Sequence, residues 1–321
     1  MTRAMAAVCA SLLLAGSVSA QSGAAAELEV QQLRPNFYVI SGAGANIGVQ
    51  IGEDGVVVVD AGTAADADTV LRVIRRLSPA PIRYVIDTTG DPDHVGGNET
   101  LSKAGQSLLN PTAIGITTNF LGGVASILSA EGVLARISAR PPQGLGLPAG
   151  AWPTETFDEP RKYMYLNGEG IEIFHQPSAH TDGDVFVFFR RSDVVMAGDV
   201  MDTTRFPVID VARHGSVNGE LAALNRLVDL AIPSVPIVSR DAGTLVVPGH
   251  GRICDQIDVV EYRDMVSVIR DRVRDLVDAG STAEQIRAAA PARGYVGRYG
   301  GDRATAAFID AAARSLMAEK R

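Results

Sequence analysis

Apolar runs separated by short polar turns dominate the first third of the chain. Between Asn36 and Asp60 the segments FYVI, NIGVQIG and VVVVD are rich in β-branched and aromatic residues, and Gly-rich or Glu-Asp-Gly turns separate them. Residues 64–77 instead carry apolar residues at helical spacing. Residues 82–87, IRYVID, form the next β-rich run. The pattern predicts three strands, a helix and a further strand, followed by a polar loop over residues 88–98.

The second half of the chain repeats the order of strands followed by helices. A helix rich in small and apolar residues is predicted over residues 120–137, and the Pro/Gly-rich residues 141–153 form a loop. Strands then follow at YMYL, IEIFH, VFVFF, DVVMAGD and, further on, TLVVPGHG. Further helices are predicted over residues 217–230, 259–278, 282–290 and 303–317. Two such successions predict one α/β domain with two layers of sheet and helices outside.

The first residues have the layout of a secretory signal rather than of a folded element. Arg3 precedes an apolar run over residues 5–15, and Val-Ser-Ala ends at Ala20. A basic start, an apolar centre and small residues at the exit are typical of a cleaved signal peptide, and the apolar run is too short for a lasting membrane span. We therefore expect a signal peptide over 1–20, a single domain over 21–321, and a periplasmic or secreted protein.

Charge and cysteine content exclude several classes of function. The chain has 29 Lys and Arg against 37 Asp and Glu, a net charge of −8, and loss of Arg3 with the signal makes it more negative. Such a surface has no electrostatic footprint for nucleic acid or anionic lipid. Of the two cysteines only Cys254 remains after residues 1–20. An internal disulfide and a cysteine-built metal site are therefore excluded, and a small molecule is the expected partner.

Four polar loops follow apolar strands directly and carry three of the five histidines. Strand ends are rigid positions from which a loop can approach a ligand. Imidazole and carboxylate, which are frequent in these loops, are ligands suited to zinc and other first-row divalent metals. The loops are Asp87-Thr-Thr-Gly-Asp-Pro-Asp-His-Val-Gly-Gly97, Pro177-Ser-Ala-His-Thr-Asp-Gly-Asp184, Ala197-Gly-Asp199 and Pro248-Gly-His-Gly251.

These loops, in this order, resemble the metallo-β-lactamase superfamily over nearly the whole predicted mature chain. The pattern of that family is T-H-x-H-x-D-H-x-G-G after a strand, then H-T-x-G-D, G-D and G-H-G. The N-terminal run GANIGVQIGEDGVVVVDAG is also similar to the opening of that family. The resemblance implies an αβ/βα sandwich, in which helices flank two central mixed β-sheets.

Two positions depart from the family pattern, and both belong to its first metal site. Thr89 stands where the first His of the H-x-H pair is expected, and Asp91 where the second is. The resemblance implies a complete second site at Asp93, His94, Asp199 and His250. It reduces the first site to Asp91, His180 and the shared Asp199. One imidazole and two carboxylates should hold zinc more weakly and accept harder ions such as Mn²⁺ or Fe²⁺ more readily.

The resemblance implies hydrolysis by water whose pKa a divalent metal lowers to about 7. Asp93 or Asp91 orients or deprotonates this water, and the role of Asp91 as ligand, base or loop-capping residue is left open. We expect one tightly held Zn²⁺, or two, with Mn or Fe as alternatives. Export favours an ester, lactone, amide or β-lactam outside the cytoplasm. An iron-dependent redox protein and an inactive metal-binding member of the family are the alternatives.

Overall fold

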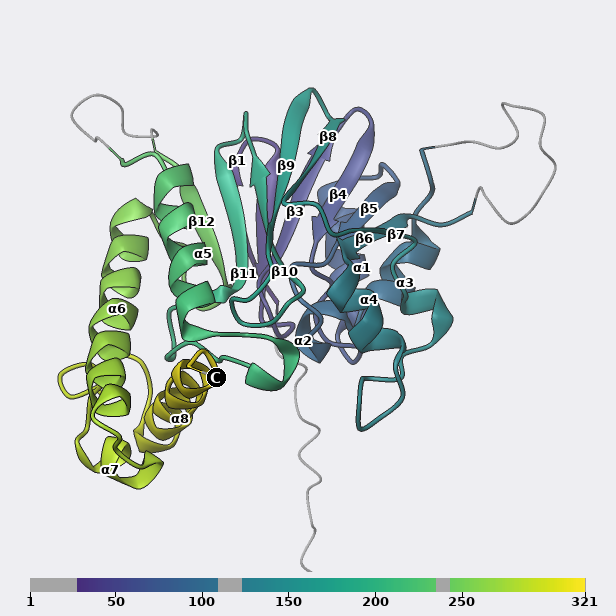
Figure 1. Cartoon of the computed structure of the whole chain (residues 1–321). Coiled ribbons are helices and arrows are strands. Elements are labelled where there is room, and N and C mark those ends of the chain that lie inside the picture. The colour runs from purple at the N-terminus through teal and green to yellow at the C-terminus, as the bar shows by residue number, and fades with distance from the viewer. Residues whose placement is uncertain (1–27, 109–122, 235–242, 321) are drawn as a thin grey trace, which may run out of the picture.

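Two β-sheets packed face to face form the centre of the molecule, and helices cover their outer faces (Figure 1). The computed structural model describes residues 28–108, 123–234 and 243–320. The predicted signal peptide lies outside these residues. This arrangement confirms the predicted αβ/βα sandwich.

The first sheet has seven strands that neighbour one another in chain order. They are β1 (Glu29–Arg34), β2 (Phe37–Ser41), β3 (Ile47–Gly52), β4 (Gly55–Val59), β5 (Ile82–Ile86), β6 (Ser126–Ala130) and β7 (Glu155–Phe157). Strands β1 to β4 pair antiparallel, and β4 to β7 pair parallel. The carboxyl ends of β4 and β5 therefore lie at one edge of the sheet.

The second sheet has five strands in the order β12-β11-β10-β9-β8. They are β8 (Arg161–Leu166), β9 (Glu169–Gln176), β10 (Asp184–Phe189), β11 (Val194–Asp202) and β12 (Leu245–His250). Only β11 and β12 pair parallel, with Gly198 opposite Pro248 and Asp202 opposite His250. This parallel pairing brings the two loops that contain Asp199 and His250 to the same end of the sheet.

Three apolar clusters hold the layers together. Residues of both sheets, such as Val57 and Val187, form the layer between them. Val70 of α1 and Leu101 of α3 pack on the outer face of the first sheet, and Leu224 of α5 and Ile269 of α6 on the outer face of the second. The helices are α1 (Ala67–Leu77), α2 (Pro92–Val95), α3 (Asn98–Ala104), α4 (Glu131–Ser138), α5 (Val217–Leu230), α6 (Gln256–Asp278), α7 (Ala283–Ala288) and α8 (Asp302–Ala318).

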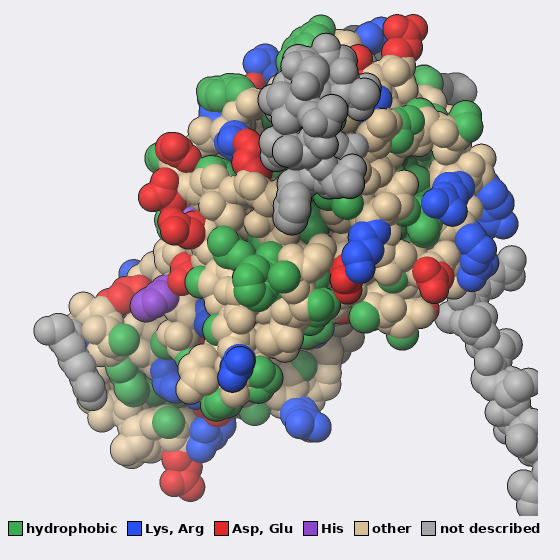
Figure 2. Space-filling view, turned by 90° about the vertical axis from the view of Figure 1, so that its right-hand side faces the viewer, with side chains coloured by type: hydrophobic (Ala, Val, Ile, Leu, Met, Phe, Trp, Pro, Cys, Tyr) green, Lys and Arg blue, Asp and Glu red, His purple; other side chains and the backbone are tan. Residues whose placement is uncertain are grey.

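On the face that includes α1, α3 and α4, Lys and Arg side chains gather at the right-hand edge of the view, Asp and Glu gather at the upper left, and hydrophobic side chains lie between them (Figure 2). The inner sides of α1 and α3 are apolar and pack on the sheet, which explains the helical period of residues 64–77. Among the described residues, no helix is long and apolar enough to cross a membrane.

The helix predicted over residues 120–137 is wrong in its central part. Residues 126–130 form the buried strand β6, which pairs parallel with β5 and β7, and only α4 is helical. A short apolar run suits a buried strand as well as a helix, so its period alone could not decide. Residues 109–122 lie outside the described part. The polar loop over 88–98 contains the short helix α2, and strands β1 and β7 were not predicted.

Candidate metal centre

The predicted site residues gather at one end of the sandwich, around α2, where the two sheets meet (Figure 1). Two groups of ligand atoms lie there, each within 4.8 Å of one another: one from Asp93, His94 and His250, the other from Asp91, His180 and Asp199. We call Asp93, His94, Asp199 and His250 the second half-site. The first half-site consists of Asp91, His180 and the shared Asp199.

The helix α2 places Asp93 and His94 by a tight turn against the end of β4. Pro92 occupies the first turn of the helix, a position where its missing N–H and its fixed φ suit a helix start. A Cβ at Gly96 would lie 2.4 Å from the backbone N of Ala64, and one at Gly97 would lie 2.3 Å from the carbonyl O of Ala61. Only glycine allows this close approach, which sets the direction of the loop.

The second half-site is a connected set of imidazole and carboxylate groups. His250 Nε2 lies 2.9 Å from Asp93 Oδ2, and its Nδ1 lies 2.9 Å from Asp199 Oδ1. His94 Nε2 lies 3.2 Å from the same Asp199 oxygen. A Cβ at Gly249 would lie 2.2 Å from Asp199 Oδ1, so glycine at this position leaves room for the carboxylate.

Asp60, which follows β4, orients His94 from behind. Its Oδ2 lies 3.0 Å from His94 Nδ1 and accepts a hydrogen bond of 2.7 Å from the hydroxyl of Thr88. All three side chains are buried. A carboxylate on the far nitrogen of an imidazole leaves the other nitrogen free to bind a metal and raises its basicity. Asp60 closes the VVVVD run, but its sequence pattern did not distinguish it from a residue that ends a strand.

The charges of the second half-site favour a divalent cation. Hydrogen bonds to Asp199 and Asp93 raise the pKa of His250 to about 9. Burial opposes ionisation of Asp199, yet His94 and His250 hold the pKa of this carboxyl well below its ordinary value. The negative charge of the two carboxylates, which favours protons on the imidazoles, also attracts a metal ion that can replace those protons. Two imidazoles and two carboxylates make a donor set that fits zinc.

The first half-site is built around one carboxylate with two cationic neighbours. His180 Nε2 lies 2.8 Å from Asp91 Oδ2, while its Nδ1 lies 2.6 Å from the carbonyl O of Val208. Burial disfavours the imidazolium, but the hydrogen bond to Asp91 and the charge of Asp184 raise the pKa of His180 to about 10. The other oxygen of Asp91 is paired with Nη2 of Arg136, from α4. Both oxygens of Asp91 are therefore occupied.

Arg136 was not among the residues expected from the sequence. It falls in the segment predicted as one long helix, and its pattern resembles that of any surface arginine. Arg205 was missed for the same reason: its Nη2 lies 3.7 Å from Asp199 Oδ2, and its Nε binds Asp202. The two histidines outside the motif loops stay apart from the site: His175 is half-buried in β9, and His214 is exposed after a short turn.

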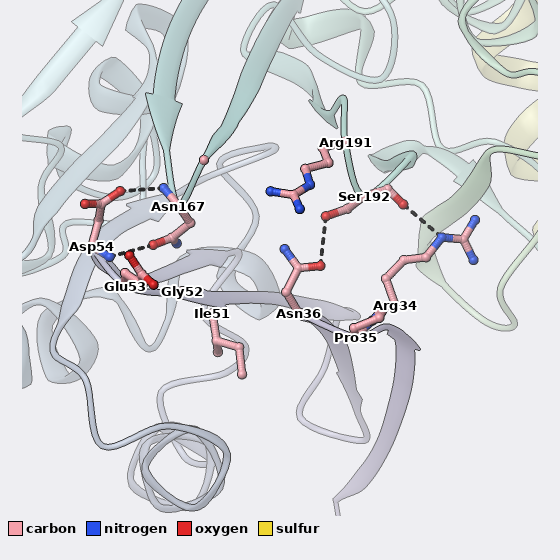
Figure 3. A pocket seen from close by; sticks show the side chains of 11 residues that line it. Arg34, Pro35, Asn36, Ile51, Gly52, Glu53, Asp54, Asn167, Arg191 and Ser192 are labelled. Atoms are coloured by element: carbon pink, nitrogen blue, oxygen red, sulfur yellow. Dashed lines mark hydrogen bonds between the residues drawn. The ribbon is translucent and has the colours of Figure 1, made fainter.

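A cavity of about 710 Å³ opens beside the first half-site. Besides Asp91 and His180 its wall carries Arg136, Arg213 and Arg314. A second cavity, of about 530 Å³, lies at the opposite end, among the hairpin turns (Figure 3). There the backbone N–H of Asn167 donates a hydrogen bond to Asp54 Oδ2, and no histidine lines the wall. Of these two cavities, the one beside Asp91 and His180 is therefore the one suited to metal-assisted chemistry.

Comparisons with known proteins agree with this architecture. Residues 41–109 match the family model described as the metallo-beta-lactamase superfamily. A metallo-beta-lactamase from Pontibacter korlensis is 17% identical, with a TM-score of 0.54, over 75% of this chain and 99% of that chain. The DIM-1 metallo-beta-lactamase is 15% identical, with a TM-score of 0.54, over 75% of this chain and 97% of that chain.

A stereoselective inverting sec-alkylsulfatase from Pseudomonas sp. is 14% identical, with a TM-score of 0.63. The match covers 91% of this chain and 50% of the alkylsulfatase, so the chain spans half the length of that protein. No curated protein sequence matches the chain. The chain thus has the metallo-β-lactamase fold, and the resemblance to that superfamily, first indicated by the four motifs, is confirmed.

Proposed function

We propose that the protein is an exported metal-dependent hydrolase that works through the second half-site. The observation that carries the proposal is the set of two imidazoles and two carboxylates, held at the ends of rigid strands. A divalent metal bound there supplies the Lewis acidity that makes water a nucleophile near neutral pH. The protein's own residues bind, orient and balance the charge.

The residues of the second half-site differ in their exposure to solvent, and one carboxylate is accessible. His94 and Asp199 are buried and fixed by their neighbours, so they serve as ligands. The side chain of Asp93 is 36% exposed, and its Oδ2 is held by His250. Asp93 is therefore the residue placed to orient an attacking water as well as to bind metal.

The positive groups beside the cavity suit a reaction in which negative charge develops. Arg136 and His180 both face Asp91, and the cavity wall adds Arg213 and Arg314. Donors fixed near an oxygen that becomes negative stabilise the transition state more than the ground state. A carbonyl ester, lactone, amide or β-lactam, in each of which water attacks a carbonyl carbon, meets this requirement.

A sulfate ester is the second candidate substrate class. The match to the sec-alkylsulfatase extends over 91% of this chain, against 75% for the two β-lactamases. The three arginines that line the cavity also favour a substrate that is anionic before reaction. This class keeps the same metal-binding residues and changes only the group that is cleaved.

A hydrolysis screen on zinc-loaded protein tests the proposal. The panel contains β-lactams, lactones, carboxylic esters, phosphoesters and secondary alkyl sulfates, each measured against an Asp93→Ala control. Hydrolysis of one class that is lost in the control supports the function and selects the substrate class. Metal-loaded, folded protein that cleaves none of them contradicts it, and iron as the native metal supports the redox alternative instead.

N-terminal sequencing of protein recovered from the periplasm or medium tests export; an intact Met1 there contradicts cleavage after Ala20.

A further inference from the structure

The first half-site contains a permanent cation supplied by the protein. Arg136 comes from the last turn of α4, and its side chain is 11% exposed. Its Nη2 pairs with Asp91 Oδ1, the oxygen that His180 does not engage. A metal ion bound to Asp91 would have to share that carboxylate with a guanidinium that stays charged at every accessible pH.

The position of Arg136 is not explained by its own hydrogen bonding. Its Nε and Nη1 atoms are buried and have no hydrogen-bond partner among the described residues. Buried donors without partners cost free energy. The charge pairing with Asp91 is therefore the contact that accounts for a guanidinium at this place.

The motif itself leaves room for the arginine. A Cβ at Gly90, between Thr89 and Asp91, would lie 3.0 Å from Cδ of Arg136. A side chain at this position would press on the stem of Arg136. Replacement of the imidazole expected at 89 by the smaller Thr89 removes a neutral ligand from the same region. Thr89 and Gly90 thus remove one metal ligand and leave space in which the cationic side chain of Arg136 reaches Asp91.

The second half-site differs in this respect. Within the described ranges, the guanidinium nearest to it that forms an ion pair is that of Arg205, whose Nη2 lies 3.7 Å from Asp199. Its Nε is directed to Asp202 instead, and Asp93 and His250 keep their contacts with each other. The carboxylates of this half-site are thus shared with imidazoles, which can give up a proton to a metal, whereas a guanidinium cannot.

We propose that the guanidinium of Arg136 takes the place of the first metal ion. The chain then holds one metal, at the second half-site, and uses Arg136 as the fixed positive charge beside Asp91. The proposal rests on the proposed function only in assigning a metal to the second half-site. It adds that Asp91 is the partner of this arginine and not a metal ligand.

Metal counting on the full-length protein tests the proposal directly. Protein is loaded with excess Zn²⁺, dialysed against a weak chelator and analysed for zinc per chain. The unmodified protein should retain about one ion, and Arg136→Ala and Arg136→Gln about two, because Asp91, His180 and Asp199 are then free to bind. Arg136→Lys should stay near one, since an ammonium group keeps the charge. Arg213→Ala, which lines the same cavity but removes a partner of Asp210, should also stay near one.

Two zinc ions in the unmodified protein, or one in both neutral variants of Arg136, would overturn the proposal. Arg136→Gln retains most of the side-chain volume, and thermal melting of each variant shows whether the count comes from folded protein. A correct metal count together with no hydrolysis in the substrate screen would contradict the proposed function and leave the assignment of Arg136 standing. The two conclusions therefore fail through different measurements.

Discussion

The two half-sites share Asp199 and one end of the sandwich, yet their carboxylates have different partners. In the second, the carboxylates of Asp93 and Asp199 are shared with His94 and His250, whose protons a metal can displace. In the first, Asp91 is held between His180 and the guanidinium of Arg136. The comparison teaches that a fold which offers two adjacent ligand positions can fill one of them with a side-chain cation.

The largest expected effect is the loss of the second half-site. His250→Ala and Asp93→Ala should each abolish tight metal binding and lower hydrolysis by more than about 100-fold, because even partners behind a ligand contribute about 10–100-fold. Both side chains lie in or beside loops at strand ends, so the fold should survive. Elemental analysis with thermal melts measures this, and His214→Ala, at an exposed loop position, is the control. Full metal content in either variant would refute the ligand assignment.

A smaller loss of metal affinity is expected when Asp60, the carboxylate that contacts His94 Nδ1, is substituted. Asp60→Asn keeps the shape of the side chain and suits the positive φ of 63° at this position. It removes the charge that orients His94, so metal affinity should fall by about 10–100-fold. Chelator competition measures the dissociation constant. Asp54→Asn, in the hairpin turns at the opposite end, is the matched control, and equal affinities in the two variants would show that Asp60 has no part in metal binding.

Metal binding at the second half-site should strengthen with pH. Without metal, hydrogen bonds to Asp199 and Asp93 raise the pKa of His250 to about 9, so below that pH its ring carries a proton that a metal must displace. Affinity should therefore rise by about tenfold per pH unit for each proton released, and the part of this rise that comes from His250 should level off as the pH passes about 9. Chelator competition at several pH values tests this. An affinity that does not change between about pH 6 and about pH 8 would show that no proton leaves on binding.

The smallest expected change is a gain at the first half-site. Thr89→His with Asp91→His restores the histidine pair, and it should raise the tightly held metal from about one ion toward two per chain. The gain should remain incomplete while Arg136 is present, because a guanidinium beside the new imidazoles repels a cation. Adding Arg136→Ala to this pair should complete it. Equal metal counts in the double and triple variants would show that Arg136 does not oppose metal binding at the first half-site.

Local sequence patterns determined the elements and most of the ligand set. The helix over 217–230 and the strands that carry Asp199 and His250 were predicted within a few residues, because a periodic apolar face is a local property. The four motif loops identified the members of both half-sites, and the structure brings them together. Their assignment as ligands and the exported state remain predictions.

Only the tertiary structure decided what surrounds those ligands. Arg136 reaches Asp91 because β6 and α4 pack beside β5. That packing depends on β6, a strand whose sequence pattern predicted a helix. Asp60 meets His94 through the turn at Gly96 and Gly97, which packs closely against the residues that follow β4. In the sequence the only local sign of this packing is the pair of glycines. Ligand identity is a property of the motif, whereas the charge beside each ligand depends on long-range packing. For that reason the sequence indicated where a metal is expected to bind, and the structure showed that the first half-site is paired with the guanidinium of Arg136.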